Sequence, residues 1–347
     1  MREQLFFDNW VALSKDEKIS IMQEVINEKC LPMTIKSVKT FELNNLQFET
    51  VVFEMPYKCD KNCENEQCTE NEPIEFIFVP GKKQQVLGWD SKTCKIEDEI
   101  IKFMEQEFLG YYEWWLIGNQ EEIDYLEKEI EKAKQHNNKE KQEEYEQEIV
   151  EYRENVTDPS ELKTIEEWLE YLDKNTTPIR TVDIMPMIVE VYPRGTEEIN
   201  TELSDIFSFP TEDEWEYLYG GGSRSLFPWY GKEQLETALD VTLFMNVWST
   251  KNDERHAKIN KFVNESNAFG LFFDLDTYTG ELVSSGCFSK GSDGGGSVCG
   301  GDGLFYVAPV ISTFYSRNIY KIENYMQLIE NRKIPENRCL YRRVIRL

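Results

Sequence analysis

The segment Phe209–Gly231, FPTEDEWEYLYGGGSRSLFPWYG, constrains the fold more than any other part of the chain. Thr211 is followed three residues later by Glu214, the spacing of a capping box that starts a helix. Three large side chains then have the i, i+3, i+4 spacing of one apolar helical face: Trp215, Leu218 and Tyr219. Gly220–Gly222 ends the helix. The sequence therefore predicts a short capped helix whose tryptophan anchors it in a core.

Length and charge limit the classes of protein that remain. A chain of 347 residues with 40% hydrophobic residues can form one large domain or two ordinary ones. The net charge of −27 opposes binding to nucleic acid and to anionic membranes, and fits a basic partner or simple solubility. The eight cysteines come without a recognisable signal peptide or apolar span, so we expect reduced thiols in a cytoplasmic protein.

The first ninety residues alternate between helix and strand patterns. Residues 14–29 carry a helical apolar stripe and begin at Ser14, a good helix cap. The period changes to two over residues 35–57, which predicts strands. Two β-rich runs in Ile74–Asp90 flank Pro80–Gly81, so we expect a hairpin there.

The middle of the chain is helical and highly charged. Residues 96–117 are amphipathic and aromatic, and we expect a helix packed on the sheet. Residues 119–175 predict a charged helical hairpin, inserted before the β pattern resumes at Thr177–Val191. Its charged side chains form a solvated face, a partner surface or a dimer coil.

These segments, in this order, resemble the formylglycine-generating enzyme (sulfatase-modifying factor) superfamily. The central match comprises Phe209, Pro210-Thr211-Glu212, Glu214-Trp215-Glu216-Tyr217 and Phe227-Pro228-Trp229 with Gly231. Further matches are Phe76–Gly81 with Val86-Leu87-Gly88, Thr177-Pro178 with Arg180, Asn267 with Phe269-Gly270-Leu271, and Leu340, Val344 and Ile345 near the end. The resemblance implies an α+β protein with the C-type-lectin-like fold of the formylglycine-generating-enzyme type. That domain would span residues 71–347, interrupted by the insertion 119–175, and residues 1–70 would be an N-terminal extension.

The resemblance also suggests a structural Ca²⁺ site. Met245–Trp248 is similar to an Asn-apolar-Trp element of the family, in which the Asn side chain and the next carbonyl hold the ion. The corresponding ligands here would be Asn246 and Val247, with Asp253 as the nearest acid downstream. The alternative is an asparagine in a turn that binds no metal.

The reaction centre of the family is only partly present. Its oxidases use two cysteines about five residues apart to bind Cu(I), and thiolates are the ligands that soft copper prefers. In this chain Ser297 and Cys299 match, but the next cysteine is Cys339, in the terminal strand. The chain resembles a divergent member without the paired catalytic cysteines, so we do not expect copper, and its status as an enzyme stays open.

The preferred interpretation is a non-catalytic module that binds a protein or a small-molecule ligand. Its binding face would come from the loops at 274–318, with five exposed aromatic residues: Tyr278, Phe305, Tyr306, Phe314 and Tyr315. One alternative is a copper- or iron-dependent oxidase of a thiol-containing substrate, with Ser297 and Cys299 in catalysis. A second alternative is a scaffold that acts through the acidic helical hairpin.

Two smaller groups of residues also suggest sites. Four cysteines could form a zinc knuckle, but their spacing is not the usual pair of C-x2–4-C units, and ordinary free thiols are the preferred interpretation: Cys59, Cys63, Cys68 and Cys94. The basic cluster near the end contains Arg342, Arg343 and Arg346. In so acidic a chain we expect these arginines to pair with carboxylates on neighbouring strands, with an anion site as the alternative.

Overall fold

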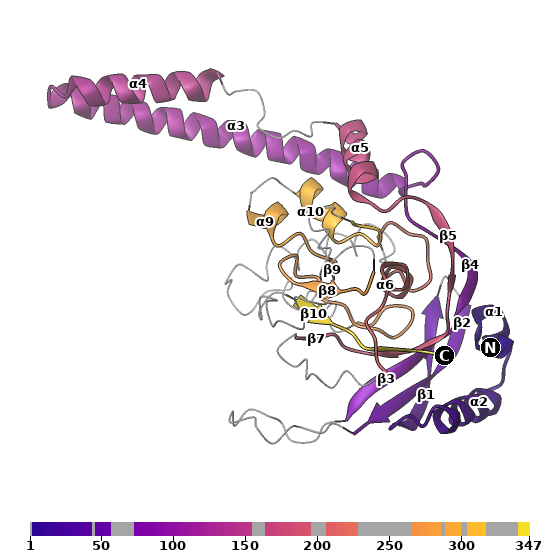
Figure 1. The fold of residues 1–347 in the computed structure, drawn as a ribbon. Helices are drawn as coiled ribbons and strands as arrows, with labels where there is room; N and C mark the ends of the chain where they lie inside the picture. The colour runs from indigo at the N-terminus through magenta and orange to yellow at the C-terminus, as the bar shows by residue number, and fades with distance from the viewer. Residues whose placement is uncertain are drawn as a thin grey trace, which may run out of the picture.

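The computed structural model describes residues 2–43, 46–56, 73–154, 164–195, 206–227, 265–285, 289–299, 304–316 and 339–347. These residues form an α+β protein in which helices and mainly antiparallel strands are both abundant (Figure 1). The general fold class expected from the sequence is therefore confirmed.

The strands of the described residues form three sheets. The largest has the order β1-β2-β3-β6-β11, a second has the order β7-β10-β8-β9, and β4 pairs with β5. Adjacent strands are antiparallel except β8 and β10, which are parallel. The strands are β1 (Thr34–Leu43), β2 (Leu46–Met55), β3 (Ile74–Val79), β4 (Lys82–Leu87), β5 (Arg180–Ile184), β6 (Met187–Glu190), β7 (Arg194–Gly195), β8 (Gly280–Leu282), β9 (Ser289–Lys290), β10 (Cys339–Tyr341) and β11 (Val344–Arg346).

The N-terminal helix and hairpin form as the sequence predicts. The helix α2 (Lys15–Glu28) begins with a capping box between Ser14 and Glu17, and it packs against β1 and β2. Those strands form an antiparallel pair in which Leu43 pairs with Leu46. Because β2 also pairs with β3, the N-terminal strands belong to the same sheet as β6 and β11.

The prediction of a β-hairpin in Ile74–Asp90 is wrong. β3 pairs with β2 and β6, whereas β4 pairs with β5, so the chain passes from one sheet to another at Pro80–Gly81. A Cβ at Gly81 would lie 2.7 Å from the Ile184 carbonyl oxygen. The glycine is therefore needed for a close approach to the chain that links β5 and β6, and distant partners decide the pairing.

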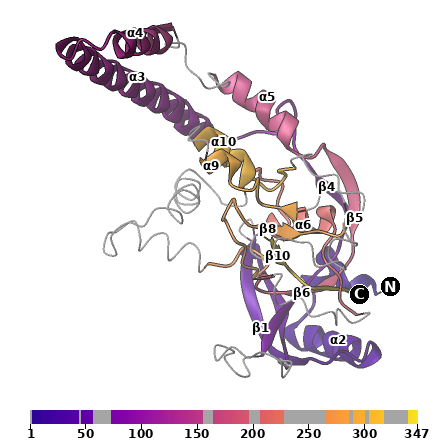
Figure 2. The ribbon, with the colours of Figure 1, turned by 60° about the vertical axis from the view of Figure 1, so that its left-hand side comes forward.

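The charged segment forms a long helical hairpin that extends away from the sheets in both views (Figures 1 and 2). Its helices are α3 (Asp98–Gln135) and α4 (Lys139–Glu154), and Asn137 between them has a left-handed φ of 52°. A small core of its own holds the two helices together: Ile123, Leu126, Ile130 and Ile149. The predicted hairpin is present, but α3 begins at Asp98 and runs unbroken through residue 119.

The base of α3 packs chiefly on helices and not, as expected for residues 96–117, on a sheet. Its neighbours there are α5 (Ile165–Asn175) and α10 (Leu304–Val310). The rings of Phe108 and Tyr111 lie 4.5 and 5.3 Å from that of Phe305. The expectation failed because the amphipathic pattern shows that one face is buried but does not identify the covering element.

The remaining described helices are short, and none of the described helices is suited to a bilayer. They are η1 (Glu3–Leu5), α1 (Phe7–Trp10), α6 (Glu212–Tyr219) and α9 (Gly296–Cys299). Across the described ranges, every helix is too short or too polar to span a membrane.

Candidate functional site

Helix α6 forms the centre of the candidate site, and it begins as the sequence predicts. The Thr211 side chain accepts a hydrogen bond from the Glu214 amide, and the Glu214 carboxylate accepts one from the Thr211 amide. Trp215 is 2% exposed and stacks on Tyr219 with ring centroids 4.5 Å apart. The tryptophan is thus the buried anchor that the capping and apolar patterns indicated.

Asn267 connects the C-terminal end of α6 to the chain that follows. Its side-chain amide donates to the carbonyl oxygens of Leu218 and Tyr219 at 2.6 and 3.2 Å. Its side-chain oxygen accepts from the amides of Phe269 and Leu271. One asparagine therefore satisfies carbonyls that a helix end leaves free and fixes a tight turn at the same time.

A buried ion-pair network lies on one side of α6. The carboxylate of Glu216, which is fully buried, accepts hydrogen bonds from Thr177 at 2.8 Å, Arg180 at 2.9 Å and Lys290 at 3.0 Å. Burial alone would lower the pKa of Arg180, but Glu216 and Asp213 raise it above its ordinary value. The carboxylates therefore favour the charged form of Arg180, and the two cations lie where they offset the negative charge of Glu216.

A second network joins α6 to the C-terminal strands. Glu281 on β8 accepts from the Trp215 indole at 3.2 Å and from two guanidinium nitrogens of Arg342, at 2.7 and 3.2 Å. Arg342 also donates to the carbonyl oxygens of Glu190, Val191 and Phe272. All five N–H groups of this fully buried guanidinium are thereby used.

The other two C-terminal arginines are also paired with acids. Arg343 donates to Glu190 on β6 at 2.8 and 3.0 Å, and Arg346 donates to Glu214 on α6 at 2.6 Å through two nitrogens. The prediction that this cluster pairs with carboxylates is confirmed, although the partner of Arg346 lies on a helix and not on a strand.

Cys299 lies at the exposed end of α9, and its thiol contacts a phenol. Its sulfur and the Tyr278 hydroxyl share a hydrogen bond of 2.6 Å, which raises the pKa of Tyr278. Asp293 accepts from the amides of Gly295 and Ser297, which fixes the loop before α9. The Ser297 hydroxyl is buried, and it has no hydrogen-bond partner among the described residues.

The other described thiols lie in different surroundings. Cys339 is buried in β10, where burial raises the pKa of its thiol to about 11. Cys94 accepts a long contact of 3.7 Å from Arg224, and Cys30 is exposed at the end of α2. All four described cysteines are free thiols. A thiol with a raised pKa is a poorer nucleophile near neutral pH than an exposed one.

The expectation of five exposed aromatic residues is wrong for three of them. Phe305 and Phe314 are fully buried, and Tyr315 is 3% exposed. Phe305 is buried because α10 packs beneath α3 and α5, where the Trp168 indole donates to the Phe305 carbonyl oxygen at 2.9 Å. Phe314 and Tyr315 follow α10, and their backbone pairs with Thr177 and Thr176. Only Tyr278 and Tyr306 of the set are partly exposed, and Tyr306 contacts Tyr171 edge to face.

Several predicted sites fall outside the described part of the chain. These are the calcium ligands Asn246, Val247 and Asp253, and the thiols Cys59, Cys63 and Cys68. Within the residues that the structure describes, there is no group of three or more His, Cys, Asp or Glu side chains placed to hold a metal ion. The calcium and zinc interpretations thus stay predictions.

Sequence reasoning missed the importance of Lys290 and Glu281. Lys290 lies in a segment rich in glycine and serine, and it pairs with Glu216. Glu281 lies in a segment with a β pattern, and it pairs with Arg342. Each partner is more than 60 residues away in the sequence. The one usable signal was that a charged residue next to short apolar strands needs a partner when it is buried.

Comparisons with known proteins give no match. No protein-family model fits the sequence, and neither the curated proteins nor the solved structures contain a significant relative.

Proposed function

We propose that the chain is a non-catalytic module that binds a protein or a small-molecule ligand, on a C-type-lectin-like scaffold of the formylglycine-generating-enzyme type. The observation that carries the proposal is the surrounding of Cys299. At the position where the family places its pair of thiolates, the Cys299 sulfur contacts the Tyr278 hydroxyl at 2.6 Å. A phenol is a hard oxygen donor and a poor substitute for a second soft thiolate on Cu(I).

The chemistry of the interior also favours a binding role. A general base needs access to its substrate and a free lone pair, whereas Glu216 is buried and accepts from three donors. Glu281 is likewise held by Arg342 and Trp215. These carboxylates stabilise the arrangement of α6, β8 and β10, which is a structural role.

The binding face that remains is the rim formed by Tyr278 and the end of α9. Tyr278 is partly exposed and lies above Gly295, where an added Cβ would be 2.1 Å from the phenol ring. The glycine therefore lets the ring lie flat on the loop. A tyrosine held in this way offers a flat apolar surface and a hydroxyl, which suits the recognition of a protein or an organic ligand.

The alternative function, a metal-dependent oxidase, is tested by measuring copper binding and oxygen consumption together. We expect the protein, titrated with Cu(I) against bicinchoninate, to retain no stoichiometric copper that depends on Cys299, and to consume no oxygen with a cysteine peptide. One equivalent of copper that is lost in Cys299→Ser, together with oxygen uptake, would overturn the proposal.

The binding role has its own measurement. The purified protein is applied to arrays of defined peptides and glycans, and any ligand found is titrated against Tyr278→Ser and Tyr192→Ser. Tyr192 is a matched control because it is an exposed tyrosine on a different segment, after β6. The proposal expects binding that weakens in Tyr278→Ser and not in Tyr192→Ser. Equal affinities for both variants would remove Tyr278 from the binding face.

A further inference from the structure

Helix α3 exposes a stripe of large apolar side chains midway along its length. Leu109 and Trp114 are each 65% exposed and Ile117 is 61% exposed. Tyr112, at 40%, borders the same segment. We call the set of Leu109, Trp114 and Ile117 the outer stripe. Large apolar side chains grouped in this way on a helix are unusual on a free surface and mark a site of interaction.

The buried face of α3 is already occupied, so the outer stripe is not needed to hold the hairpin. Phe108 and Tyr111 contact Phe305 at the base of the helix. Further along, Ile123 and Leu126 pack against α4. The outer stripe is exposed between these two packed stretches. Leu109 and Ile117 point away from the packed face, whereas Trp114 borders it, with its ring 6.0 Å from that of Tyr111.

Carboxylates alternate with the outer stripe along one ridge of α3. Residues at intervals of four form one line on a helix, and here that line reads Leu109, Glu113, Ile117 and Glu121. Between Lys102 and Lys128 the sequence has seven Asp or Glu and no Lys, Arg or His. The surface that carries the stripe is therefore apolar and strongly negative.

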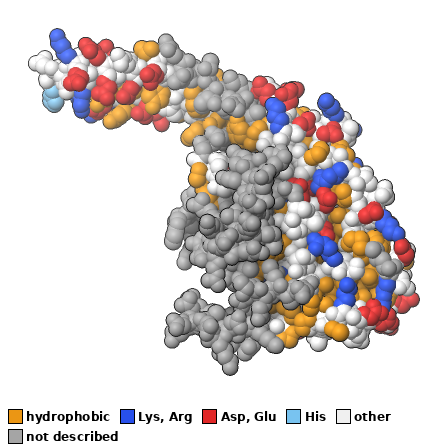
Figure 3. Space-filling view, viewed as in Figure 1, with side chains coloured by type: hydrophobic (Ala, Val, Ile, Leu, Met, Phe, Trp, Pro, Cys, Tyr) orange, Lys and Arg blue, Asp and Glu red, His pale blue; other side chains and the backbone are white. Residues whose placement is uncertain are grey.

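These acids are not neutralised within the part of the chain that the structure describes. There, Glu113 and Glu121 have no basic partner, and the same is true of Glu105 and Glu122. The ion pairs of the hairpin lie further toward its tip, as between Lys132 and Glu129. Figure 3 shows carboxylates spread over the hairpin with apolar side chains among them.

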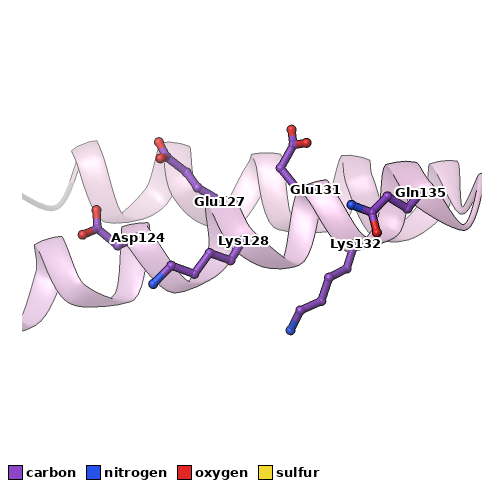
Figure 4. Close-up of a pocket in the computed structure, with 6 residues that line it drawn as sticks. All are labelled: Asp124, Glu127, Lys128, Glu131, Lys132 and Gln135. Carbon is purple, nitrogen blue, oxygen red and sulfur yellow. The ribbon is translucent and has the colours of Figure 1, made fainter.

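The same side of α3 continues toward the tip as a shallow groove (Figure 4). The residues that line it are Asp124, Glu127, Lys128, Glu131, Lys132 and Gln135. They follow Glu121 at steps of three or four, so a helical partner lying on the outer stripe would reach the groove along one continuous ridge.

The charge of the hairpin decides between a second copy and a different partner. The two helices α3 and α4 contain eighteen Asp or Glu and seven Lys or Arg, a formal balance of −11. Two such hairpins placed stripe to stripe would bring like charges together without compensation. A partner with lysines or arginines between apolar residues would instead satisfy both features of the ridge.

We propose that the outer face of α3 from Leu109 to Glu121 is a docking surface for a basic amphipathic helix of a partner protein. Apolar residues of that helix cover the outer stripe, and its basic residues pair with Glu113 and Glu121. Helix recognition uses apolar anchors about one or two turns apart, with tryptophan as a common main anchor. Here Trp114 and Ile117 are three residues apart, and Leu109 and Ile117 are eight residues apart. This surface is separate from the rim around Tyr278, so the inference goes beyond the function proposed above.

The test uses a fluorescein-labelled amphipathic helical peptide of leucine and lysine, about three turns or more in length, with fluorescence anisotropy as the readout. The variant is the full-length chain with Leu109→Ser, Trp114→Ser and Ile117→Ser combined. It keeps every charge, so any loss of affinity comes from the stripe. We expect binding to weaken at least about tenfold, as expected for removal of an interface anchor.

Two controls separate the stripe from general attraction to an acidic protein. Val11→Ser with Ile179→Ser changes exposed apolar residues elsewhere, at 42% and 38% exposure, and leaves affinity unchanged. Glu113→Gln with Glu121→Gln weakens binding at low salt and flattens its salt dependence. Circular dichroism and thermal unfolding confirm that each variant is folded.

Three results would overturn the proposal. Equal peptide affinity for the wild type and the stripe variant would mean that binding is charge attraction alone. Sedimentation that shows a wild-type dimer, dissociated by the same three substitutions, would assign the stripe to a second copy. Binding to zwitterionic phosphatidylcholine vesicles that the variant loses would assign it to a lipid surface.

Discussion

Replacing Arg342 with lysine tests the claim that a buried guanidinium holds the C-terminal strands to the core. Arg342 is fully buried and donates five hydrogen bonds, two to Glu281 and three to backbone carbonyl oxygens. A lysine keeps the charge but has only three N–H groups in a different geometry. At least two buried acceptors would therefore lose their donor.

The size of the effect follows from that count. Each hydrogen bond between a charged group and a buried partner contributes about 1.5–3 kcal/mol, and disruption of a buried pair costs about 3–5 kcal/mol. We expect Arg342→Lys to lower the free energy of unfolding by about 3–5 kcal/mol. The arginine also lies 4.3 Å from the centre of the Phe273 ring, and a lysine would lose part of that contact.

The neighbouring arginine is the matched control. The Arg343 side chain is 15% exposed and pairs with Glu190, which Arg194 also contacts. Because Arg194 remains and lysine can still reach the carboxylate, Arg343→Lys should cost about 1 kcal/mol or less. Both variants are unfolded in urea, followed by circular dichroism and tryptophan fluorescence. Equal unfolding free energies would refute the donor count as the cause.

Three further predictions concern two glycines and one partly buried acid. Gly110→Ala should stabilise the protein by about 0.5–1 kcal/mol, because Gly110 is helical and an added Cβ would meet nothing within 4 Å. Gly270→Ala should destabilise it by more than about 2 kcal/mol, because φ is +77° and the Cβ would lie 2.3 Å from an aromatic side chain. The unfolding free energy of both variants is measured in urea, and a change of the same sign in both would contradict the argument. Burial raises the pKa of Asp274 above the ordinary 3.8, so the folded state keeps this proton to a higher pH than the unfolded state does. The free energy of unfolding of the wild type therefore falls as the pH rises from the unfolded-state pKa to the folded-state pKa. Asp274→Asn should therefore gain stability relative to the wild type at pH 7 and lose the gain below about pH 4; a gain independent of pH would count against it.

Helix starts were predictable because their causes are local. Ser14 with Glu17, and Thr211 with Glu214, form capping boxes within four residues of sequence. No distant contact is needed to read them. The strands β1 and β2 were predictable for a related reason, since alternation of apolar and polar residues over neighbouring positions indicates a strand.

The change of sheet at Pro80–Gly81 could not be predicted locally. The two runs β3 and β4 have the sequence pattern of a hairpin, and only the positions of β6 and β5 separate them. Those partners lie about a hundred residues later, beyond the helical hairpin. A pattern with a period of two shows that a strand forms, but it does not show which strand lies beside it.

The candidate site was predicted only in part for the same physical reason. An aromatic run beside a glycine loop indicated exposed residues, but α10 folds beneath α3 and α5, and Phe305 becomes core. Conversely, residues 96–117 indicated a helix packed on the sheet, and the base of α3 packs chiefly on α5 and α10. Both errors concern which helix covers which, and that is settled by packing over long sequence distances.

The two ion-pair networks meet at Trp215, and this is why charge at the centre of the fold argues for a scaffold. The Trp215 indole donates to Glu281, while the ammonium of Lys290 lies 5.7 Å from the indole ring centre. Lys290 belongs to the network around Glu216, and Glu281 belongs to the network around Arg342. Removing one of these charges leaves a buried partner with less compensation, so a structural role accounts for them. Carboxylates held by several buried donors fix the position of α6, and the binding role that we propose places no demand on them.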